Sequence, residues 1–169
     1  MNSLLAADEN VQIWMGDNNL TAIVGSDSII TRIIDERFPD FESVIPTDND
    51  KELLVERKAL LSAVKRVSIF SNRSTHQIAL EISGDKAIIR TEDPEKASKA
   101  KEEISTKLNG ENITIGYNAA YLKDVLMHLK SQNIVFHLKS STSAGLIFPD
   151  LQEPNSDITM LLMPIRLND

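Results

Sequence analysis

The residue types that most often carry catalysis or bind metals are scarce in this sequence and are not grouped. Its 169 residues include no cysteine, which excludes a disulfide scaffold, a thiolate zinc site and a cysteine nucleophile. The three histidines, His76, His128 and His137, lie far apart along the chain. We therefore predict no metal site and no bound cofactor. We interpret the histidines as surface residues or as residues with satisfied hydrogen bonds.

Two other patterns invite a catalytic interpretation, and neither supports it. Residues 140–143 are all serine or threonine, but they lie at an expected turn and lack the glycine-flanked elbow of a nucleophilic serine. Glu102 and Glu103 lie in a charged stretch, where we expect both carboxylates to be solvated. The six glycines are isolated, so the chain has no glycine-rich phosphate loop. The sequence predicts a protein that is not an enzyme. A Ser/Asp or His/Asp enzyme is an alternative that would need a converging polar pocket.

Charge and hydropathy limit the function further. The net charge is −7, and residues 1–48 alone carry nine acidic and two basic side chains, whereas the rest of the chain is balanced. Proteins that grip nucleic acid tightly are usually basic, so any DNA contact must come from a local basic face. The longest apolar run, around residues 160–163, is far below the ~20 residues of a membrane span. With no secretion signal at the N-terminus, we expect a soluble, cytoplasmic protein.

The length suits one domain and part of another, and the first part has too few elements to be a domain alone. Residues 16–19 have the composition of a hairpin turn between two strand-like runs. Pro39 and Pro46 hold the segment between them extended, and the polar residues 47–50 are the best candidate for a domain boundary. The expected elements are a helical turn at 3–8 and strands at 11–15, 20–24 and 28–34.

Beyond that boundary, a strand–helix–strand–strand pattern occurs twice, about 60 residues apart. Each helix has apolar residues at spacings of three, one and three, which form one stripe. The stripes are Leu60, Ala63, Val64 and Val67 in the first helix, and Leu122, Val125, Leu126 and Leu129 in the second, which Asn118 caps. The strands are expected at 52–55, 77–82, 86–91, 112–115, 134–139, 144–148 and 158–163.

One stripe on each helix predicts that both helices pack on one face of a mainly antiparallel sheet, an α+β fold with internal pseudo-symmetry. Between the two copies, we expect the charged residues 95–101 to form a loop and residues 102–108 to form another strand.

The end of the chain combines a proline with apolar side chains that are hard to bury. Leu161 and Leu162 alternate across a strand, so one of them should complete the core. Pro164 stops ladder pairing, which leaves Met163, Ile165 and Leu167 less easily hidden. Flexible apolar groups near a surface suit an adaptable peptide groove. The alternative is that they only complete the core.

Three motifs occur in order along the chain, and together with the repeated unit they are hard to obtain by chance. They are Arg37-Phe38-Pro39-Asp40-Phe41 with Val44-Ile45-Pro46, then Gly116-Tyr117-Asn118-Ala119-Ala120-Tyr121-Leu122, then Met163-Pro164-Ile165-Arg166-Leu167. In their order and spacing they resemble the bacterial DNA polymerase III beta subunit, the replicative sliding clamp family. The resemblance covers essentially the whole chain.

The resemblance implies the DNA-clamp fold and a division into clamp domains. Family protomers have three similar domains, and two protomers close head to tail into a ring around duplex DNA. Residues 1–48 would be the C-terminal part of the second domain, and residues 49–169 the complete third domain. The stretch near Ile104 would be the edge strand of the ring interface. Its partner surface belongs to a first domain that this sequence lacks, so we expect this chain to be a monomer.

The resemblance also implies the partners. Family members are not enzymes: they hold the replicative polymerase, the clamp loader and repair proteins through a short peptide, led by glutamine with aliphatic and aromatic anchors. The peptide enters a cleft between the second and third domains. Carried over motif by motif, the cleft residues here are Pro39, Val44, Asn118, Tyr121, Thr142, Leu161, Met163, Pro164, Ile165 and Arg166. Asn118 and Arg166 would bond peptide carbonyls, a role compatible with Asn118 also capping the helix.

In that family, helices with basic outer faces line the ring. The corresponding residues here are Lys58, Lys65, Arg66, Lys123 and Lys130. A few cations on paired helices suit loose, sequence-independent sliding over phosphates. The alternative interpretation of these residues is an ordinary solvated face. The alternative function is a stand-alone peptide-binding adaptor that does not encircle DNA.

Overall fold

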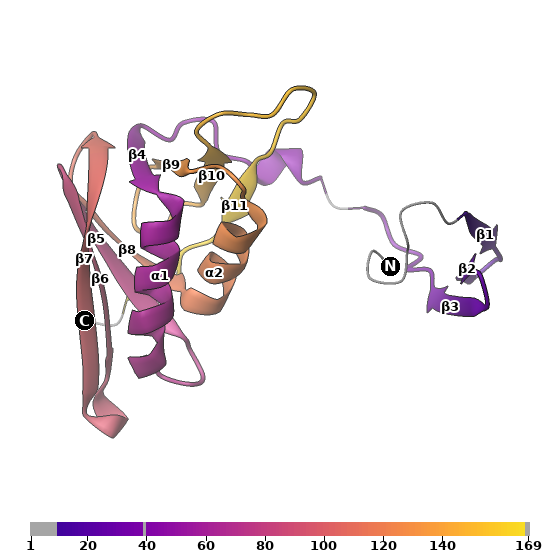
Figure 1. The fold of residues 1–169 in the computed structure, drawn as a ribbon, viewed down its shortest axis with the longest axis horizontal. Coiled ribbons are helices and arrows are strands. Elements are labelled where there is room, and N and C mark those ends of the chain that lie inside the picture. Colours follow the sequence, from indigo (N-terminus) through magenta and orange to yellow (C-terminus); the bar gives the residue numbers. More distant parts are fainter. Residues whose placement is uncertain (1–9, 39, 168–169) are drawn as a thin grey trace. The chain divides into compact units, whose positions relative to one another are not determined.

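The computed structural model describes residues 10–38 and 40–167 of the chain. The chain forms two compact units that divide between residues 40 and 41, and each is described by itself (Figure 1). The expected helical turn at 3–8 lies outside the described residues, as does Pro39. No described helix is long and apolar enough to cross a membrane.

The first unit contains the three predicted strands in one antiparallel sheet. The order is β1 (Val11–Met15), β2 (Asn19–Val24) and β3 (Asp27–Arg32), with Gly16 and its neighbours forming the first hairpin turn. The third strand ends at Arg32, two residues before its predicted end. Ala22 and Val24 on the central strand are buried, whereas Trp14 and Ile30 are exposed. The hairpin predicted from residues 16–19 is confirmed.

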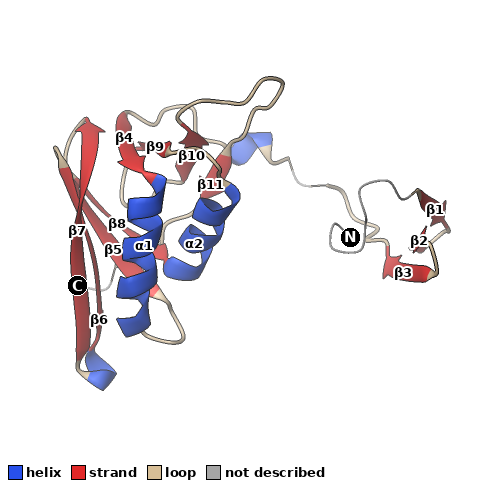
Figure 2. Cartoon of the chain, viewed as in Figure 1, coloured by secondary structure: helices blue, strands red, loops and turns tan. Residues whose placement is uncertain are grey.

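The second unit is an eight-stranded antiparallel sheet covered on one face by two helices, α1 (Arg57–Val67) and α2 (Ala119–His128), which lie side by side (Figures 1 and 2). The order across the sheet is β11-β10-β9-β4-β7-β6-β5-β8. The strands are β4 (Lys51–Glu56), β5 (Gln77–Ser83), β6 (Lys86–Asp93), β7 (Ser98–Asn109), β8 (Ile113–Asn118), β9 (Asn133–Leu138), β10 (Gly145–Pro149) and β11 (Met160–Leu162).

The predicted strand–helix–strand–strand repeat is confirmed, and its two copies exchange strands. β4 leads into α1 but pairs with β9, the strand that follows α2. In the same way, β8 leads into α2 but pairs with β5, the strand that follows α1. Each helical connection therefore carries the chain from one half of the sheet to the other.

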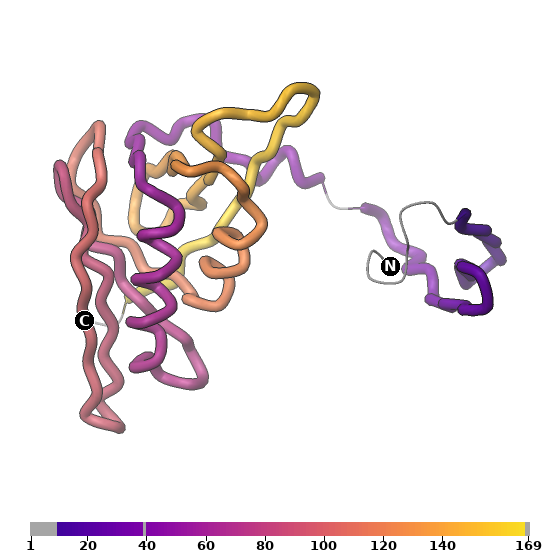
Figure 3. The backbone as a smooth tube through the Cα atoms, viewed as in Figure 1, coloured from indigo at the N-terminus to yellow at the C-terminus, as the bar shows by residue number. Residues whose placement is uncertain are grey.

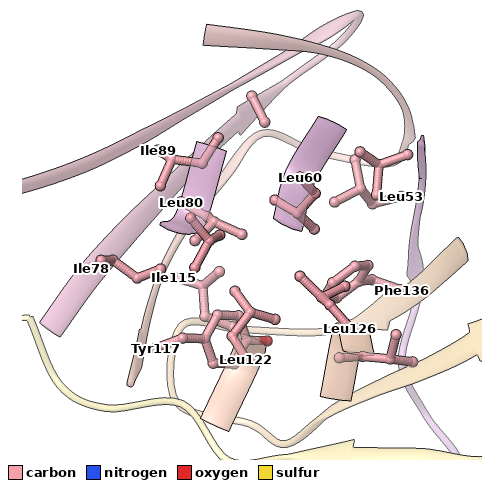
Figure 4. Packing of buried hydrophobic residues seen from close by; sticks show 14 of the residues in the cluster. Leu53, Leu60, Ile78, Leu80, Ile89, Ile115, Tyr117, Leu122, Leu126 and Phe136 are labelled. Carbon is pink, nitrogen blue, oxygen red and sulfur yellow. The ribbon is translucent and has the colours of Figure 1, made fainter. Parts of the chain in front are cut away.

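The core lies between the sheet and the two helical stripes (Figure 4). The first stripe is buried at all four predicted positions, and the second at all except Val125, which is half-buried. The sheet contributes large side chains that are also buried, among them Leu53, Leu80 and Phe136. The periodicity that predicted the helices thus also identified the faces that they bury.

The loop predicted at residues 95–101 is wrong over its second half. A short 3₁₀ turn, η3 (Pro94–Lys96), is followed by Ala97 in the left-handed conformation, and β7 already begins at Ser98. Lys99 and Lys101 are exposed, and Ala100 between them is half-buried. The alternation of exposed and half-buried positions favours a strand with one wet face, and it outweighs the high charge of the stretch.

Tyr117 carries one of several buried polar atoms that have no hydrogen-bond partner among the described residues. Tyr117 on β8 is fully buried, and its hydroxyl makes no hydrogen bond to any described residue. The same burial raises the pKa of its phenol. A Cβ added at Gly145 would lie 2.6 Å from this hydroxyl oxygen, so the strand must carry glycine at this point.

We predict that Tyr117→Phe leaves the free energy of unfolding unchanged or raises it by up to ~1 kcal/mol, because an unpaired buried hydroxyl is removed. Urea unfolding measures the change as a higher midpoint at an unchanged slope. Tyr121→Phe is the matched control, since Tyr121 is exposed and should shift stability by less than ~0.5 kcal/mol. A loss well above ~1 kcal/mol in Tyr117→Phe would reveal a partner for the hydroxyl and contradict the interpretation.

Candidate functional site

The C-terminal segment, residues 160–167, connects the two ends of the sheet. Its first residues form β11, where Leu162 pairs with Gly145 and Leu161 with Leu146 of β10. After Pro164, the amide of Ile165 donates to the carbonyl oxygen of Gly116 at 2.9 Å, so the chain bridges to β8, the strand at the opposite edge. Figure 3 follows this yellow segment across the molecule. The sheet is thereby closed by the last residues that the structure describes.

This segment presents apolar side chains of graded exposure. Leu162 is buried in the core, which confirms that one of the two leucines completes it, and Leu161 is half-buried on the other face. Met163 is 60% exposed, and Pro164 and Ile165 are half-buried. Because proline ends the ladder at this point, Met163 remains at the surface of a closed sheet. The predicted exposure of Met163 is confirmed, whereas Ile165, where it bridges to β8, and Leu167 are half-buried.

A cavity of about 340 Å³ adjoins the segment. It is lined by hydroxyl-bearing side chains from β8 and the β9–β10 turn, by a cation, and by the segment itself: Thr114, Ser141, Thr142, Ile165, Arg166 and Leu167. Three residues predicted for the peptide cleft, Thr142, Ile165 and Arg166, thus line one cavity. A surface with hydroxyl donors, a guanidinium and aliphatic carbons suits a ligand with both polar and apolar groups.

The serine-rich run at residues 140–143 is the predicted hairpin turn. The amide of Ser143 donates to Ser140 Oγ at 3.1 Å, and the hydroxyls of Ser140 and Ser143 are 2.8 Å apart. These hydrogen bonds within the turn fix its shape. They hold Thr142 at the rim of the cavity.

The start of α2 lies next to the segment, because Gly116 is two residues from Asn118 and α2 contacts β11. Asn118 Oδ1 accepts from the amides of Ala120 at 2.8 Å and Tyr121 at 3.4 Å, which confirms the predicted helix cap. Its Nδ2 donates to the carbonyl of Thr75 at 3.3 Å. Tyr121 is 66% exposed. The cap fixes where the exposed Tyr121 ring leaves the helix.

The first motif is only partly described. Val44 ends a short 3₁₀ turn, η1 (Glu42–Val44), in the same unit as the segment, and it is 62% exposed. Pro39, the other predicted cleft residue of this motif, lies outside the described residues. The structure thus describes all the predicted cleft residues except Pro39.

The predicted basic residues lie on or beside the two helices. Lys58, Lys65 and Lys130 are exposed, and Lys123 is half-buried. Arg66 is engaged: its Nε donates to Glu102 on β7 at 2.9 Å, and its Nη2 bonds the other carboxylate oxygen. The Arg66 hydrogen bonds hold the pKa of Glu102 below its usual range. Among the described residues, the four lysines make no ion pair, whereas the charge of Arg66 is neutralised by Glu102.

The edge near Ile104 is open along most of β7. β6 pairs with residues 98–105 on one side, whereas β4 pairs on the other side only with residues 106–109. Ile104 itself is half-buried against the core. Beside this edge, the 3₁₀ turn η2 (Ser68–Phe70) exposes Ile69 and Phe70, and Ser98 Oγ donates to the Phe70 carbonyl at 3.2 Å.

Two features of this arrangement were missed by the sequence reasoning. The exposed pair Ile69 and Phe70 follows directly after the first helical stripe, where a run of apolar residues off the stripe was the available signal. Arg57 donates to the carbonyls of Ser131 at 2.9 Å and Leu126 at 3.1 Å, so it ties the start of α1 to the end of α2. No pattern near Arg57 indicates partners about 70 residues away.

Titratable residues do not converge elsewhere in the described chain. No group of three or more His, Asp or Glu side chains that could hold a metal ion occurs among the described residues. His137 packs against Phe148 with ring centroids 4.9 Å apart, and its Nε2 is 3.7 Å from Glu52. The Nδ1 of His128 lies 2.8 Å from the Asp124 carbonyl oxygen.

A closed antiparallel sheet with two paired helices on one face is the fold of sliding clamps. The DnaN sliding clamp (DNA polymerase III subunit beta) of Pseudomonas aeruginosa, solved bound to griselimycin, has a TM-score of 0.81 and 32% identity to this chain, over 98% of this chain and 44% of that one. A DnaN sliding clamp from Bartonella birtlesii bound to griselimycin gives 0.81 and 30%, over 93% and 41%.

Sequence comparison identifies the family. Residues 42–166 match the model of the DNA polymerase III beta subunit, C-terminal domain. The beta sliding clamp of Pseudomonas aeruginosa is 33% identical over 97% of this chain, and that of Escherichia coli 30% identical over 99%. The chain belongs to the DNA polymerase III beta subunit family, as its three motifs predicted. It spans 44% of the length of these two curated relatives.

We predict that the Arg66–Glu102 pair makes stability depend on pH. The folded pKa of Glu102 is lower than the unfolded one, so the pair stabilises the fold above about pH 4.3, the usual glutamate value. That contribution disappears as the pH falls through the folded pKa. Glu102→Gln should therefore lower Tm at neutral pH, and its Tm should converge with that of the parent in acid.

Thermal unfolding across this pH range measures the effect, and added salt should reduce it because both partners are partly exposed. The control is Glu111→Gln, since Glu111 is exposed and makes no ion pair in the described part of the chain. A Glu102→Gln deficit that persists unchanged at low pH would assign its origin to packing rather than charge.

Proposed function

We propose that this chain acts as part of a DNA polymerase processivity factor, a sliding clamp that tethers the replicative polymerase and other partners to duplex DNA in the cytoplasm. Its role is non-catalytic. The single observation that carries the proposal is the C-terminal segment. It closes the sheet, leaves Met163 exposed, and contributes Ile165 and Arg166 to the cavity that Thr142 also lines. Family membership supplies the functional class.

In this proposal the chain corresponds to particular clamp domains. Residues 1–48 are the C-terminal part of a second clamp domain, and residues 49–169 are a complete third domain. The family match over residues 42–166 with the C-terminal domain supports the second assignment. The clamp class closes as a head-to-tail homodimer ring, and we propose that the chain of 169 residues by itself is a monomer.

Partner proteins, among them the polymerase, the clamp loader and repair proteins, bind through a short peptide. The aliphatic anchor lies against Leu161, Met163, Pro164 and Val44. Pro39, which lies outside the described residues, is assigned to the groove by the family resemblance alone. Arg166 and the second N–H of Asn118 Nδ2 donate to peptide carbonyls, since Oδ1 serves the helix cap and the first Nδ2 N–H bonds the Thr75 carbonyl. Tyr121 flanks the groove, and Thr142 and Ile165 complete its floor. Clamps solved bound to griselimycin are consistent with a ligand site in this class of protein.

The helical face meets the DNA in this proposal. Lys58, Lys65, Lys123 and Lys130 give a sparse positive surface, which attracts phosphates without fixing a sequence or a position. Arg66 adds little free charge because Glu102 neutralises it. A surface of this kind permits sliding, since no single strong contact has to break at each step.

The ring interface uses the open edge of β7. Within residues 98–105, the amides and carbonyls that do not bond β6 can pair with the strand of another protomer. Ile104 lies in this stretch, and its side chain packs against the core. Ile69 and Phe70 lie exposed beside that edge and would add apolar area to the interface.

A peptide-binding adaptor that does not encircle DNA is the second candidate. One observation favours it, the net charge of −7, which opposes the approach of a polyanion. Peptide binding is expected of both candidates, whereas DNA binding through the helical face is expected only of the clamp.

We predict saturable binding of a labelled peptide that has a leading glutamine followed by aliphatic and aromatic anchors. Met163→Ala should weaken binding by about ten- to a hundredfold, because truncation removes apolar burial worth ~1.5–3 kcal/mol. Arg166→Ala should weaken it by about tenfold, because its charged hydrogen bonds to the peptide are removed. Fluorescence polarisation measures the dissociation constants.

Met127→Ala is the matched control, because Met127 is similarly exposed on α2 and lies outside the proposed groove. Equal weakening by Met127→Ala and Met163→Ala would relocate the binding surface. The absence of saturable binding to the parent chain would remove the peptide-groove proposal.

We predict that duplex DNA binding at low ionic strength weakens when Lys58 and Lys65 are both replaced by Ala. The slope of log K against log salt should become shallower by up to about 0.9 for each phosphate that is no longer neutralised. Lys99→Ala with Lys101→Ala is the control, since both lysines lie on the sheet face away from the helices. Equal effects of the two double variants would mean nonspecific attraction, and a parent without DNA affinity favours the adaptor.

A further inference from the structure

The last described residues of the C-terminal segment pack against Gly116 on β8, where there is no space for a side chain. A Cβ built on Gly116 would lie 2.5 Å from the carbonyl oxygen of Ile165. It would also lie 2.8 Å from Cδ2 and 3.0 Å from Cγ of Leu167. Gly116 is not among the glycines with positive φ, so its backbone conformation is open to other residues. Glycine is needed here for close approach of another segment.

Ala79, the neighbouring residue on β5, extends the surface against which Leu167 packs. Ala79 pairs with Gly116, and it points away from the core because Ile78 and Leu80 on either side point into it. Despite facing outward, Ala79 is only 3% exposed. Ala79 and Leu167 line one cavity of about 480 Å³ on this outer face. Two small residues on adjacent strands, Gly116 and Ala79, thus form a shallow surface against which Leu167 packs, called the seat below.

Apart from this seat, the described end of the chain has one main-chain link to β8. The Ile165 amide bonds the Gly116 carbonyl at 2.9 Å, and this bridge is isolated rather than part of a ladder. Met163 and Pro164 lie between β11 and that bridge. The β11 ladder fixes the chain before them, and the chain after them is fixed only while Ile165 and Leu167 pack against β8. A span held in this way opens at a low free energy once either the hydrogen bond or the seat is disrupted.

We infer that Gly116 and Leu167 are positioning residues for the peptide groove: docking of Leu167 on Gly116 and Ala79 holds Met163, Pro164 and Arg166 in their binding arrangement. The inference rests on the proposed peptide-binding function and adds that docking and peptide binding are coupled. A peptide that binds only the docked segment must favour docking, and docking must raise its affinity by the same factor.

The test uses Gly116→Ala in the full chain. The added methyl meets a backbone carbonyl, so the segment must move away and the Ile165 hydrogen bond must lengthen or break. We expect the amide of Ile165 to exchange with deuterium at least about tenfold faster than in the parent. The dissociation constant of the glutamine-led peptide should rise by about tenfold. In the parent, saturating peptide should slow the exchange of the same amide.

Two further variants separate positioning from a general decrease in stability. Gly84→Ala strains a turn at φ +55°, with no atom within 4 Å of the added Cβ, far from the C-terminal segment. It should lower Tm and leave both the Ile165 exchange and the peptide affinity unchanged. Leu167→Ala keeps Gly116 but removes the side chain that lies on the seat, and it should weaken peptide binding less than Gly116→Ala does.

The outcomes are distinct. Faster Ile165 exchange together with weaker binding in Gly116→Ala, and neither effect in Gly84→Ala, supports the inference. Faster exchange with unchanged affinity, or equally weakened binding in Gly84→Ala and Gly116→Ala, overturns the positioning role while the proposed function stands. A parent chain that binds no peptide overturns the proposed groove, and the coupling with it, irrespective of the exchange rates.

Discussion

The architecture depends on an exchange of strands between the two repeats. The strand before each helix pairs with the strand after the other helix, β4 with β9 and β8 with β5. Neither repeat can therefore complete its half of the sheet alone, and both helical connections must cross the same face. β7 joins the halves by pairing with β4 near its end and with β6 along the rest of its length. The result is a single core between the sheet and the two helices. Both helices cover one face of the sheet, and the other face is the outer surface.

Those parts of the fold that follow from local pattern could be predicted from the sequence. The 3, 1, 3 spacing identified both helices, and seven of its eight predicted stripe positions are buried. Asn118 caps α2, as its residue type suggested. The failure at Ser98–Lys101 came from giving charge more weight than alternation: Lys99 and Lys101 both face water, which a strand with one wet face permits. The family motifs indicated Met163 and Arg166, but nothing local indicated what holds them.

What the sequence did not predict depends on residues that are distant along the chain. Arg57 donates to carbonyls of Leu126 and Ser131, and Arg66 engages Glu102, so a cation expected to face outward is used within the fold. Gly116 illustrates the same limit. A glycine inside a strand indicates close approach of a backbone, but only the structure identifies that backbone as Ile165 and Leu167. The glycine indicated that another segment comes close, and the fold determined which segment it is.

The proposed peptide groove includes a segment that is held by the β11 ladder before Pro164 and by one isolated bridge after it. In the inferred coupling, the docked arrangement of this segment competes with an undocked one that lacks the binding arrangement of Met163. The apparent dissociation constant of a ligand equals its intrinsic value divided by the docked fraction. Residues that a ligand never touches, such as Gly116 and Ala79 on the outer sheet face, can therefore set affinity as effectively as those it does touch. A ligand that requires the docked state in turn stabilises the closed sheet by mass action. In the proposed function, closure of the sheet and binding of a partner peptide are therefore parts of one coupled equilibrium.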